Sequence, residues 1–571
     1  MVKWEKINQT RLPLSHERIP TPEPANILRE GSFIKEGKDA LHENVTVAKV
    51  MVEFVKSLLG PRRMSKLILT QDGRYTLTFV TTDLKTILKK MGLEHPAAQL
   101  MAGAAYSISK TKGDGAVSTI ILGGKILEKC GELVDAGVHP TTITEGLILA
   151  YRKVLEISDK LSFGLTLSVP EIIRLQIRNA LIGKLSYYDR EHLSKLVSEA
   201  AAIVDIKNVH ISEGVDVIGV KYIQGKSLTD SFLVDGLALY KELPNMYMPK
   251  RIENARIALI RGSLVVPKRK MFRYYDHRFE IRPEKLREFK DDEFKFLKSI
   301  VDKVIQTGAN VIMIEKGVDA RIADYVAKQN VMLVRRFPPP EVDRVVRATG
   351  AFAVSSFNDL NSSHLGWAKL VEHKKIGDEP WLFIWGCRNP KTVDIVLRGI
   401  SIYLLQDVER IVKSAVLSAI TLTNEPRVVF GGGAFEEEIA LRLKRYARKI
   451  PDKRQVVVEA VAEAFESIPL QLAENAGINE IDAIIQLRSK HGIGEISAGI
   501  DVMNSRVADM NELEVYDSLA VKKAVIETAF SIAMTVIQVD KYIKCKQLSD
   551  PEKYYAQRME KTKDMEVEEE V

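Results

Sequence analysis

The sequence predicts a multidomain chain of the α and α/β type, in which one mostly helical domain is interrupted by an inserted α/β domain. Apolar residues recur at three- and four-residue steps from about residue 36 to 160, and this helical pattern returns after about residue 395. Between about 205 and 375, short Val/Ile runs alternate with helical segments, which is typical of a mostly parallel sheet. A length of 571 residues allows several such domains.

The first helical part has clear local boundaries. A helix from about residue 36 ends at Gly60 and Pro61, and a hairpin follows, formed by "KLILT", the turn "QDG" and "RYTLTFVTT". Helices are expected at 95–110 and 116–135, and His139 with Pro140 begins another that continues to about residue 160.

Four short apolar runs in the inserted part are the expected strands: "RIALI", "NVIMIE", "VMLVRR" and "FAVSS". The segment 268–300 is too polar for a core and too aromatic for an inert linker, so we expect an exposed helical arm there. Proline and charge mark residues 1–30 as a tail, and residues 546–571 are expected to form an acidic, disordered tail.

Composition excludes several classes of protein. The net charge of +7 is the difference between 83 basic and 76 acidic residues without a long basic block, so no nucleic-acid partner is expected. Three distant cysteines, Cys130, Cys387 and Cys545, fit buried thiols in a reducing cytosol and neither a disulfide framework nor a zinc cluster. The N-terminal segment "MVKWEKINQT" lacks the apolar core of a signal peptide, and the longest apolar run, 528–539, is too short to span a membrane. We therefore expect a cytoplasmic protein without a membrane partner.

A Gly-Asp-Gly sequence, residues 113–115, separates two predicted helices. The N-terminus of a helix presents unpaired N–H groups and a positive dipole end, so a glycine turn before residue 116 would let phosphate oxygens approach the backbone. Asp114 would then hold a Mg²⁺ ion that bridges these phosphates. The alternative is a tight turn with an N-cap and no ligand.

Three further glycine-bearing or polar breaks occur, "LLGPRRM" at 58–64, "VTTDLKT" at 80–86 and "FGGGAFEEE" at 430–438. The last precedes a helix with glutamates in its first turn, a favourable match to the helix dipole. No G-x-x-x-x-G-K-[ST] sequence is present, so the chain is not a P-loop enzyme. Each break alone is a weak signal.

The order and spacing of these breaks resemble the group II chaperonins, the family of the archaeal thermosome and the eukaryotic cytosolic chaperonin. The resemblance extends from about residue 28 to 545 and includes "HPAAQLM", "VHPTTITEGLILAYRK", "RRFPPPEVDRVVRATGA", "IVLRG" and "IPLQLAENAGI". It implies an equatorial domain (31–160 and 411–545), an intermediate hinge domain (161–213 and 376–410) and an apical domain (214–375) with a lid protrusion at about 268–300. Balanced high charge suits a thermophile and favours an archaeal chain, a divergent third (gamma) type of thermosome subunit.

The resemblance also implies functional residues. ATP and Mg²⁺ are the expected cofactors, with Asp114 as metal ligand, and the expected nucleotide-binding residues are Leu59, Gly60, Pro61, Gly113, Asp114, Gly115, Ser118, Lys184, Gly432, Gly433 and Asp517. Lys184 corresponds to a lysine that senses the γ-phosphate, and Asp517 stands where the family usually has Glu near the adenosine. Aromatic residues of the arm either contact the client or pack the arm onto its domain: Tyr274, Tyr275, Phe279 and Phe289.

Departures from the family pattern concern catalysis. "GPRRMSK" has Arg63 in place of a glycine and Ser65 in place of an aspartate, and "GDGAVS" lacks two phosphate-binding hydroxyls. In "DVERIVKSAV", Ser414 replaces the aspartate that orients and deprotonates the attacking water. An alcohol with a high pKa cannot act as this base, so we predict slow or absent ATP hydrolysis. Asp83 is the residual candidate for orienting the water, and compensation by a nearby group remains the alternative.

Three functions are therefore compared. The first is a subunit of a hetero-oligomeric chaperonin with two stacked rings, whose sister subunits supply most of the ATP hydrolysis while the ring encloses non-native client proteins. The second is a fully active chaperonin ATPase able to form a homo-oligomer. The third is a scaffold that has kept the fold but not the chaperone function; the retained lid, hinge and apical motifs argue against it.

Overall fold

The computed structural model describes residues 33–72, 75–164, 168–182, 185–204, 217–265 and 283–544. Both predicted tails lie outside these segments, as do Lys184, Cys545, the aromatic residues 274, 275 and 279 of the predicted arm, and the side chain of Phe289. None of the helices in these segments combines the length and the apolar character needed to cross a bilayer.

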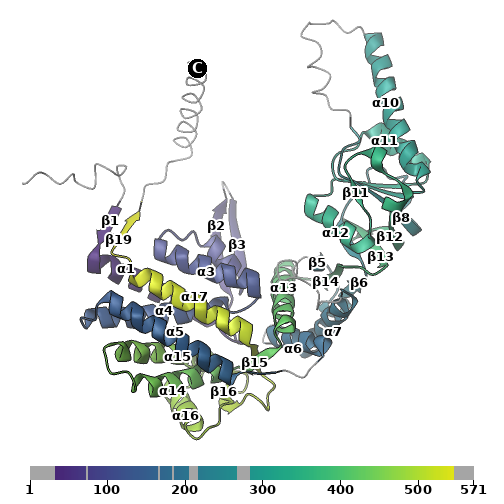
Figure 1. The fold of residues 1–571 in the computed structure, drawn as a ribbon. Coiled ribbons are helices and arrows are strands. Elements are labelled where there is room, and N and C mark those ends of the chain that lie inside the picture. Colours follow the sequence, from purple (N-terminus) through teal and green to yellow (C-terminus); the bar gives the residue numbers. More distant parts are fainter. Residues whose placement is uncertain are drawn as a thin grey trace, which may run out of the picture. The chain divides into compact units, whose positions relative to one another are not determined.

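The described chain divides into a small unit made from both of its ends, up to Asn44 and from Gln538, and a large unit, Val45–Ile537. In the small unit, strand β1 (Phe33–Glu36) pairs antiparallel with β19 (Lys541–Lys544), as Figure 1 shows. An ion pair of 3.0 Å between Lys541 and Glu36 closes this ribbon where α1 (Gly37–Val55) begins. The first and last described strands thus meet, as a domain interrupted by an insertion requires.

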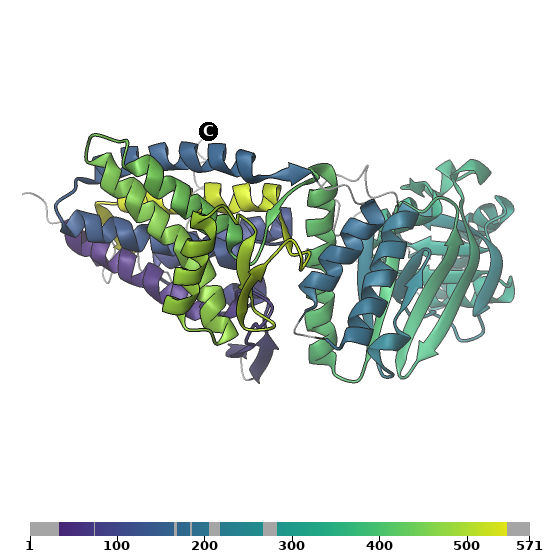
Figure 2. The same ribbon diagram turned by 90° about the horizontal axis from the view of Figure 1, so that it is seen from below.

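Within the large unit, a bundle of helices comes from two distant parts of the sequence. Its first part supplies α2 (Leu84–Lys90), α3 (Pro96–Lys112), α4 (Ala116–Asp135) and α5 (Pro140–Leu161). The second part supplies α14 (Ala434–Ala447), α15 (Arg454–Ala476), α16 (Glu480–Gly492) and α17 (Leu519–Ile537). Figures 1 and 2 show α4, α5, α15 and α17 alongside one another, and α4 contacts α3, α15 and α17.

Local predictions for this bundle are confirmed. The predicted helices at 95–110 and 116–135 are α3 and α4, and the predicted hairpin consists of β2 (Lys66–Asp72) and β3 (Tyr75–Thr81). Proline lies in the first turn of both α3 and α5, and His139 caps α5 by accepting a hydrogen bond from the backbone of Thr141. These signals act within a few residues, which is why the sequence alone reveals them.

The inserted part contains a mixed sheet in the order β10-β9-β8-β12-β13-β7. Its strands are β7 (Leu237–Tyr240), β8 (Arg251–Ile260), β9 (Val311–Ile314), β10 (Met332–Arg335), β12 (Gly366–Ile376) and β13 (Glu379–Cys387). Strands β8, β9 and β10 are parallel, and β11 (Ala353–Val354) is parallel to β8. The expected mostly parallel sheet was wrong for the other half, because β12 pairs antiparallel with both β8 and β13, and β13 pairs antiparallel with β7.

Helices cover both faces of this sheet. Apolar residues of α10 (Pro283–Gln306) and α11 (Ala320–Lys328) pack on one face, and those of α12 (Pro339–Thr349) pack on the other. Helix α10 includes the C-terminal half of the segment predicted to be a helical arm. The fold class predicted from the sequence, multidomain α and α/β, is confirmed.

A third core lies along the chain between these two parts. It joins α6 (Val169–Ala180), α7 (Tyr187–Val204) and α13 (Ile402–Asn424) to β5 (Ile218–Gln224) and β14 (Val393–Gly399). Strand β14 also pairs with β6 (Phe232–Val234). The division into three domains stays a proposal. Strands β5 and β6 pair with β14, which belongs to the predicted hinge domain, although both follow the boundary expected at residue 213.

Candidate functional site

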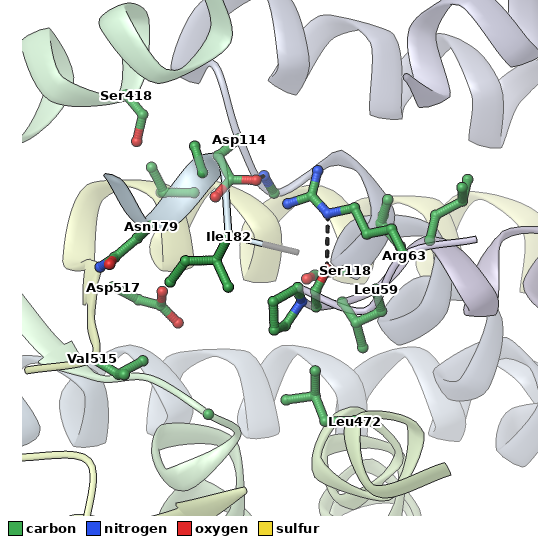
Figure 3. Close-up of a pocket in the computed structure, with 18 of the residues that line it drawn as sticks. Leu59, Arg63, Asp114, Ser118, Asn179, Ile182, Ser418, Leu472, Val515 and Asp517 are labelled. Atoms are coloured by element: carbon green, nitrogen blue, oxygen red, sulfur yellow. Dashed lines mark hydrogen bonds between the residues drawn. The ribbon is translucent and has the colours of Figure 1, made fainter. Parts of the chain in front are cut away.

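A cleft of about 370 Å³ in the large unit gathers the predicted site residues (Figure 3). This volume lies within the range of small-molecule sites. The predicted residues that line it are Leu59, Gly60, Pro61, Asp83, Gly113, Asp114, Gly115, Ser118, Ser414, Gly432, Gly433 and Asp517. Lys184 is the one predicted site residue that lies outside the described residues. The cleft thus unites loops separated by more than 300 positions in the sequence, while the role of each residue stays a prediction.

The turn between α3 and α4 presents a carboxylate and a helix N-terminus to the cleft. Gly113 ends α3 and Gly115 begins α4, and both have positive φ angles, 80° and 91°. Asp114 is exposed, and its Oδ1 accepts a hydrogen bond of 2.7 Å from the N–H of Gly115. No side chain of the described residues caps α4, so the first amides of this helix remain available to an anion.

Gly113 brings this turn into direct contact with α13. A Cβ atom at Gly113 would lie 2.4 Å from the carbonyl oxygen of Ser414 and 2.8 Å from the nitrogen of Ser418, so only glycine fits. Ser414 is half-buried beside the turn and lines the cleft. The backbone contact therefore places Ser414 beside the α3–α4 turn, and an alcohol at this position cannot remove a proton from water near neutral pH.

Sequence reasoning missed two further residues on this face of α13. Arg410 and Ser418 lie four residues before and after Ser414 and also line the cleft. The helical period would have identified both, since residues at i and i+4 share one face of a helix. Lys522 also lines the cleft, as do Gln176 and Asn179 of α6, and no sequence signal pointed to these three.

Asp83 has a structural role in addition to its predicted one. It is the N-cap of α2, and its Oδ2 accepts hydrogen bonds from the backbone N–H and the hydroxyl of Thr86, at 3.0 and 2.6 Å. The hydroxyls of Thr81 and Thr82, which precede it, donate to Asp407 of α13 at 3.2 Å. One carboxylate oxygen of Asp83 is thus engaged in capping, which restricts the side chain as a base.

The opposite wall is built by pairing of β15 (Arg427–Phe430) with β18 (Tyr516–Ser518). Their register places Val429 beside Asp517, and the N–H of Gly431 donates to the carbonyl of Val515 at 2.9 Å. Gly433 has a φ of 82° and begins α14, which no described side chain caps. A second helix N-terminus therefore adjoins the cleft.

An ion-pair chain holds Asp517 in this wall. The Lys522 ammonium lies 2.8 Å from Asp517 and 2.6 Å from Glu436, and the Lys522 side chain is only 13% exposed. Burial alone would lower the pKa of Lys522, but the charges of Asp517 and Glu436 raise it overall. Lys522 is therefore charged and orients Asp517 at the mouth of the cleft.

The loop at 59–61 is fixed by its neighbours. The side-chain amide of Asn475 donates to the carbonyls of Lys56 and Leu59, at 3.0 and 2.9 Å. The guanidinium of Arg62 donates to the carbonyls of Ala476 and Met503, at 2.9 and 2.8 Å. This edge of the cleft is consequently pre-organised by α15.

The donor set fits a metal ion only together with a phosphate. Within the described segments, no three His, Cys, Asp or Glu side chains are grouped as metal ligands, and Asp114 is a single carboxylate. Mg²⁺ usually binds through one or two carboxylates plus substrate phosphates. The uncapped N-terminus of α4 offers amides to such phosphates, so the chemistry of the cleft is compatible with a Mg²⁺–phosphate ligand.

A helical part made from two distant segments, an inserted α/β part and a glycine-lined cleft together form the architecture of a group II chaperonin subunit. The chain belongs to the TCP-1/cpn60 chaperonin family, whose model matches residues 51–547.

Comparison with known proteins gives relatives over almost the full length. The thermosome subunit alpha of Aeropyrum pernix is 37% identical over 528 residues, which cover 91% of this chain and 94% of that protein. The thermosome subunit beta of Archaeoglobus fulgidus is 36% identical over 528 residues, with 92% and 96% covered. The thermosome subunit of Pyrococcus horikoshii is 35% identical, with 92% and 95% covered. Assignment to a third, gamma type stays a prediction.

Proposed function

We propose that the chain is a subunit of an ATP-dependent, double-ring chaperonin that encloses non-native proteins in the cytoplasm and assists their folding. The single observation that carries this proposal is the cleft in which Asp114, two uncapped helix N-termini and Ser414 meet, in a member of the chaperonin family. Relatives named as alpha and beta subunits of one organism support assembly with sister chains of different sequence.

In this proposal, the triphosphate of ATP lies against the first turn of α4. Asp114 holds Mg²⁺, and the metal supplies positive charge to the phosphates when it is bound. Leu59, Gly60 and Pro61 pack on the nucleotide, Gly432 and Gly433 contact its ribose side through the backbone, and Asp517 lies near the adenosine. Lys184 senses the γ-phosphate.

Binding can be tested by titrating ADP into the purified chain with and without Mg²⁺. Asp114→Asn should lose most of the affinity that Mg²⁺ adds, because the amide is a poorer metal ligand than the carboxylate. Asp378→Asn, in the exposed turn between β12 and β13, is the matched control and should behave like the wild type. Equal Mg²⁺ dependence in Asp114→Asn and the wild type would reject Asp114 as the metal ligand.

Hydrolysis by this subunit is proposed to be weak, because Ser414 offers an alcohol where the family offers a carboxylate. A missing general base costs about 100- to 10,000-fold in rate. Ser414→Asp should therefore raise the rate of phosphate release. Ser414→Asn introduces a side chain of the same size as Asp but without its charge, so it should not raise the rate. A wild type that releases phosphate as fast as Ser414→Asp would favour the alternative, a fully active ATPase that uses another group.

Assembly into a ring is supported by an exposed apolar surface on the β2–β3 hairpin. Leu67, Leu69 and Val80 are 66%, 65% and 44% exposed on a ribbon of only two strands. Such a ribbon is marginally stable alone, and exposed apolar patches mark contact surfaces. We expect native mass spectrometry of the wild type with its sister chains to find rings, and Leu67→Lys/Leu69→Lys to be excluded from them. A wild type found in no ring would favour the scaffold alternative.

A further inference from the structure

Arg63 extends into the cleft from a fixed stretch of backbone. Its Nε donates a hydrogen bond of 2.8 Å to the carbonyl of Gly60, and its neighbour Arg62 is anchored to Ala476 and Met503. Figure 3 shows the guanidinium of Arg63 on the side of the cleft that holds Asp114, with its terminal nitrogens directed toward that carboxylate. The side chain is therefore held where a phosphate and its metal ion would lie.

Among the described residues, Arg63 is also the basic side chain of the cleft for which no ion pair is formed. Three basic residues line the cleft in the described part of the chain, Arg63, Arg410 and Lys522. Lys522 is paired with Asp517 at 2.8 Å, and Arg410 lies 3.8 Å from Asp407. Arg63 forms no ion pair with any described residue, and its one hydrogen bond there uses Nε. Its two terminal nitrogens thus remain available to an anionic ligand.

We propose that Arg63 binds a phosphate group of a nucleoside di- or triphosphate and supplies part of the positive charge that a divalent cation otherwise provides. This inference rests on the proposed nucleotide site. A guanidinium offers paired N–H donors that match phosphate oxygens, and its charge is permanent. Asp114 is the only carboxylate at the α3–α4 turn, so a metal ion there has few protein ligands and a second cation adds binding energy. Nucleotide should consequently bind to this chain without a divalent metal.

The test is calorimetric titration of ADP into the full-length wild type, Arg63→Gln and Arg448→Gln, each in Mg²⁺ and in EDTA. Arg448 is exposed at the end of α14 outside the cleft and controls for the loss of one positive charge. In EDTA, we expect the wild type and Arg448→Gln to bind ADP, and Arg63→Gln to bind about tenfold or more weakly, the loss typical of a charge-assisted hydrogen bond. In Mg²⁺ the same substitution should reduce the affinity for ADP by a smaller factor, because the metal ion then supplies positive charge to the phosphates.

The loss of ADP affinity caused by Arg63→Gln in EDTA, divided by the loss in Mg²⁺, measures the coupling between Arg63 and the metal. A ratio above one supports the proposal. A wild type that binds ADP only in Mg²⁺, an unchanged affinity of Arg63→Gln in EDTA, or equal losses in both conditions would overturn it while leaving the nucleotide site intact. No binding by the wild type in either condition would instead overturn the proposed nucleotide site itself.

Discussion

The substitution Gly113→Ala tests the contact that joins the α3–α4 turn to α13. A methyl group at this position would lie 2.4 Å from the Ser414 carbonyl oxygen and 2.8 Å from the Ser418 nitrogen. The backbone φ of 80° adds a second cost, because an L-residue in the left-handed region is disfavoured by roughly 1–2 kcal/mol. Overpacking of a closely packed site typically costs about 1–3 kcal/mol. We therefore expect a total destabilisation of about 2–5 kcal/mol.

Gly137→Ala separates these two costs. Gly137 follows the other end of α4 with a φ of 85°, and a Cβ atom there would meet nothing within 4 Å. It should therefore show the backbone cost alone, roughly 1–2 kcal/mol. The assay is hydrogen exchange of amides in α4 and α13, where each 1.4 kcal/mol changes protection about tenfold. Protection in Gly113→Ala that equals protection in Gly137→Ala would refute the close contact between the turn and α13.

Two further substitutions concern buried charges. Burial and the charge of Glu466 raise the pKa of Glu437 from 4.5 to about 7. As pH rises, the carboxyl ionises in the unfolded state before it ionises in the folded state. The free energy of unfolding therefore falls by roughly 3 kcal/mol between about pH 4.5 and pH 7. Glu437→Gln should therefore unfold at a higher denaturant concentration than the wild type at about pH 8, with the difference vanishing toward about pH 4. Asp394→Ala leaves Arg344 without the carboxylate that pairs with it at 2.5 Å between α12 and β14. Calorimetry should show a loss of about 3–5 kcal/mol, and an unchanged transition would contradict the pairing.

Local signals made much of the fold predictable. His139 and Pro140 indicate the start of α5, and Gly113 and Gly115 indicate the break between α3 and α4. Caps and glycine turns act over a few residues, so they can be recognised from the sequence alone. The strands of the antiparallel half of the mixed sheet were not recognised. Strand β12 mixes buried, half-buried and exposed residues and contains several charges, so it lacks the continuous apolar run of β9.

Some features of the candidate site could be predicted from the sequence, and others could not. Its glycine turns and Asp114 are local features, and the family resemblance gave their order. The contact of Gly113 with Ser414 joins positions about 300 residues apart, and the pairing of Lys522 with Asp517 and Glu436 depends on how β18 and α17 pack against α14. Packing between distant segments leaves no periodic mark in the sequence, so these contacts required the structure.

The most direct measurement is single-turnover release of phosphate from ATP bound to the purified wild-type chain, with sister chaperonin subunits shown to be absent by mass spectrometry. With an alcohol at position 414 and one oxygen of Asp83 engaged by Thr86, we expect ATP to remain largely unhydrolysed, at a rate about 100-fold or more below that of the Ser414→Asp variant. A wild-type rate equal to or above that of the variant would contradict a weakly hydrolysing subunit.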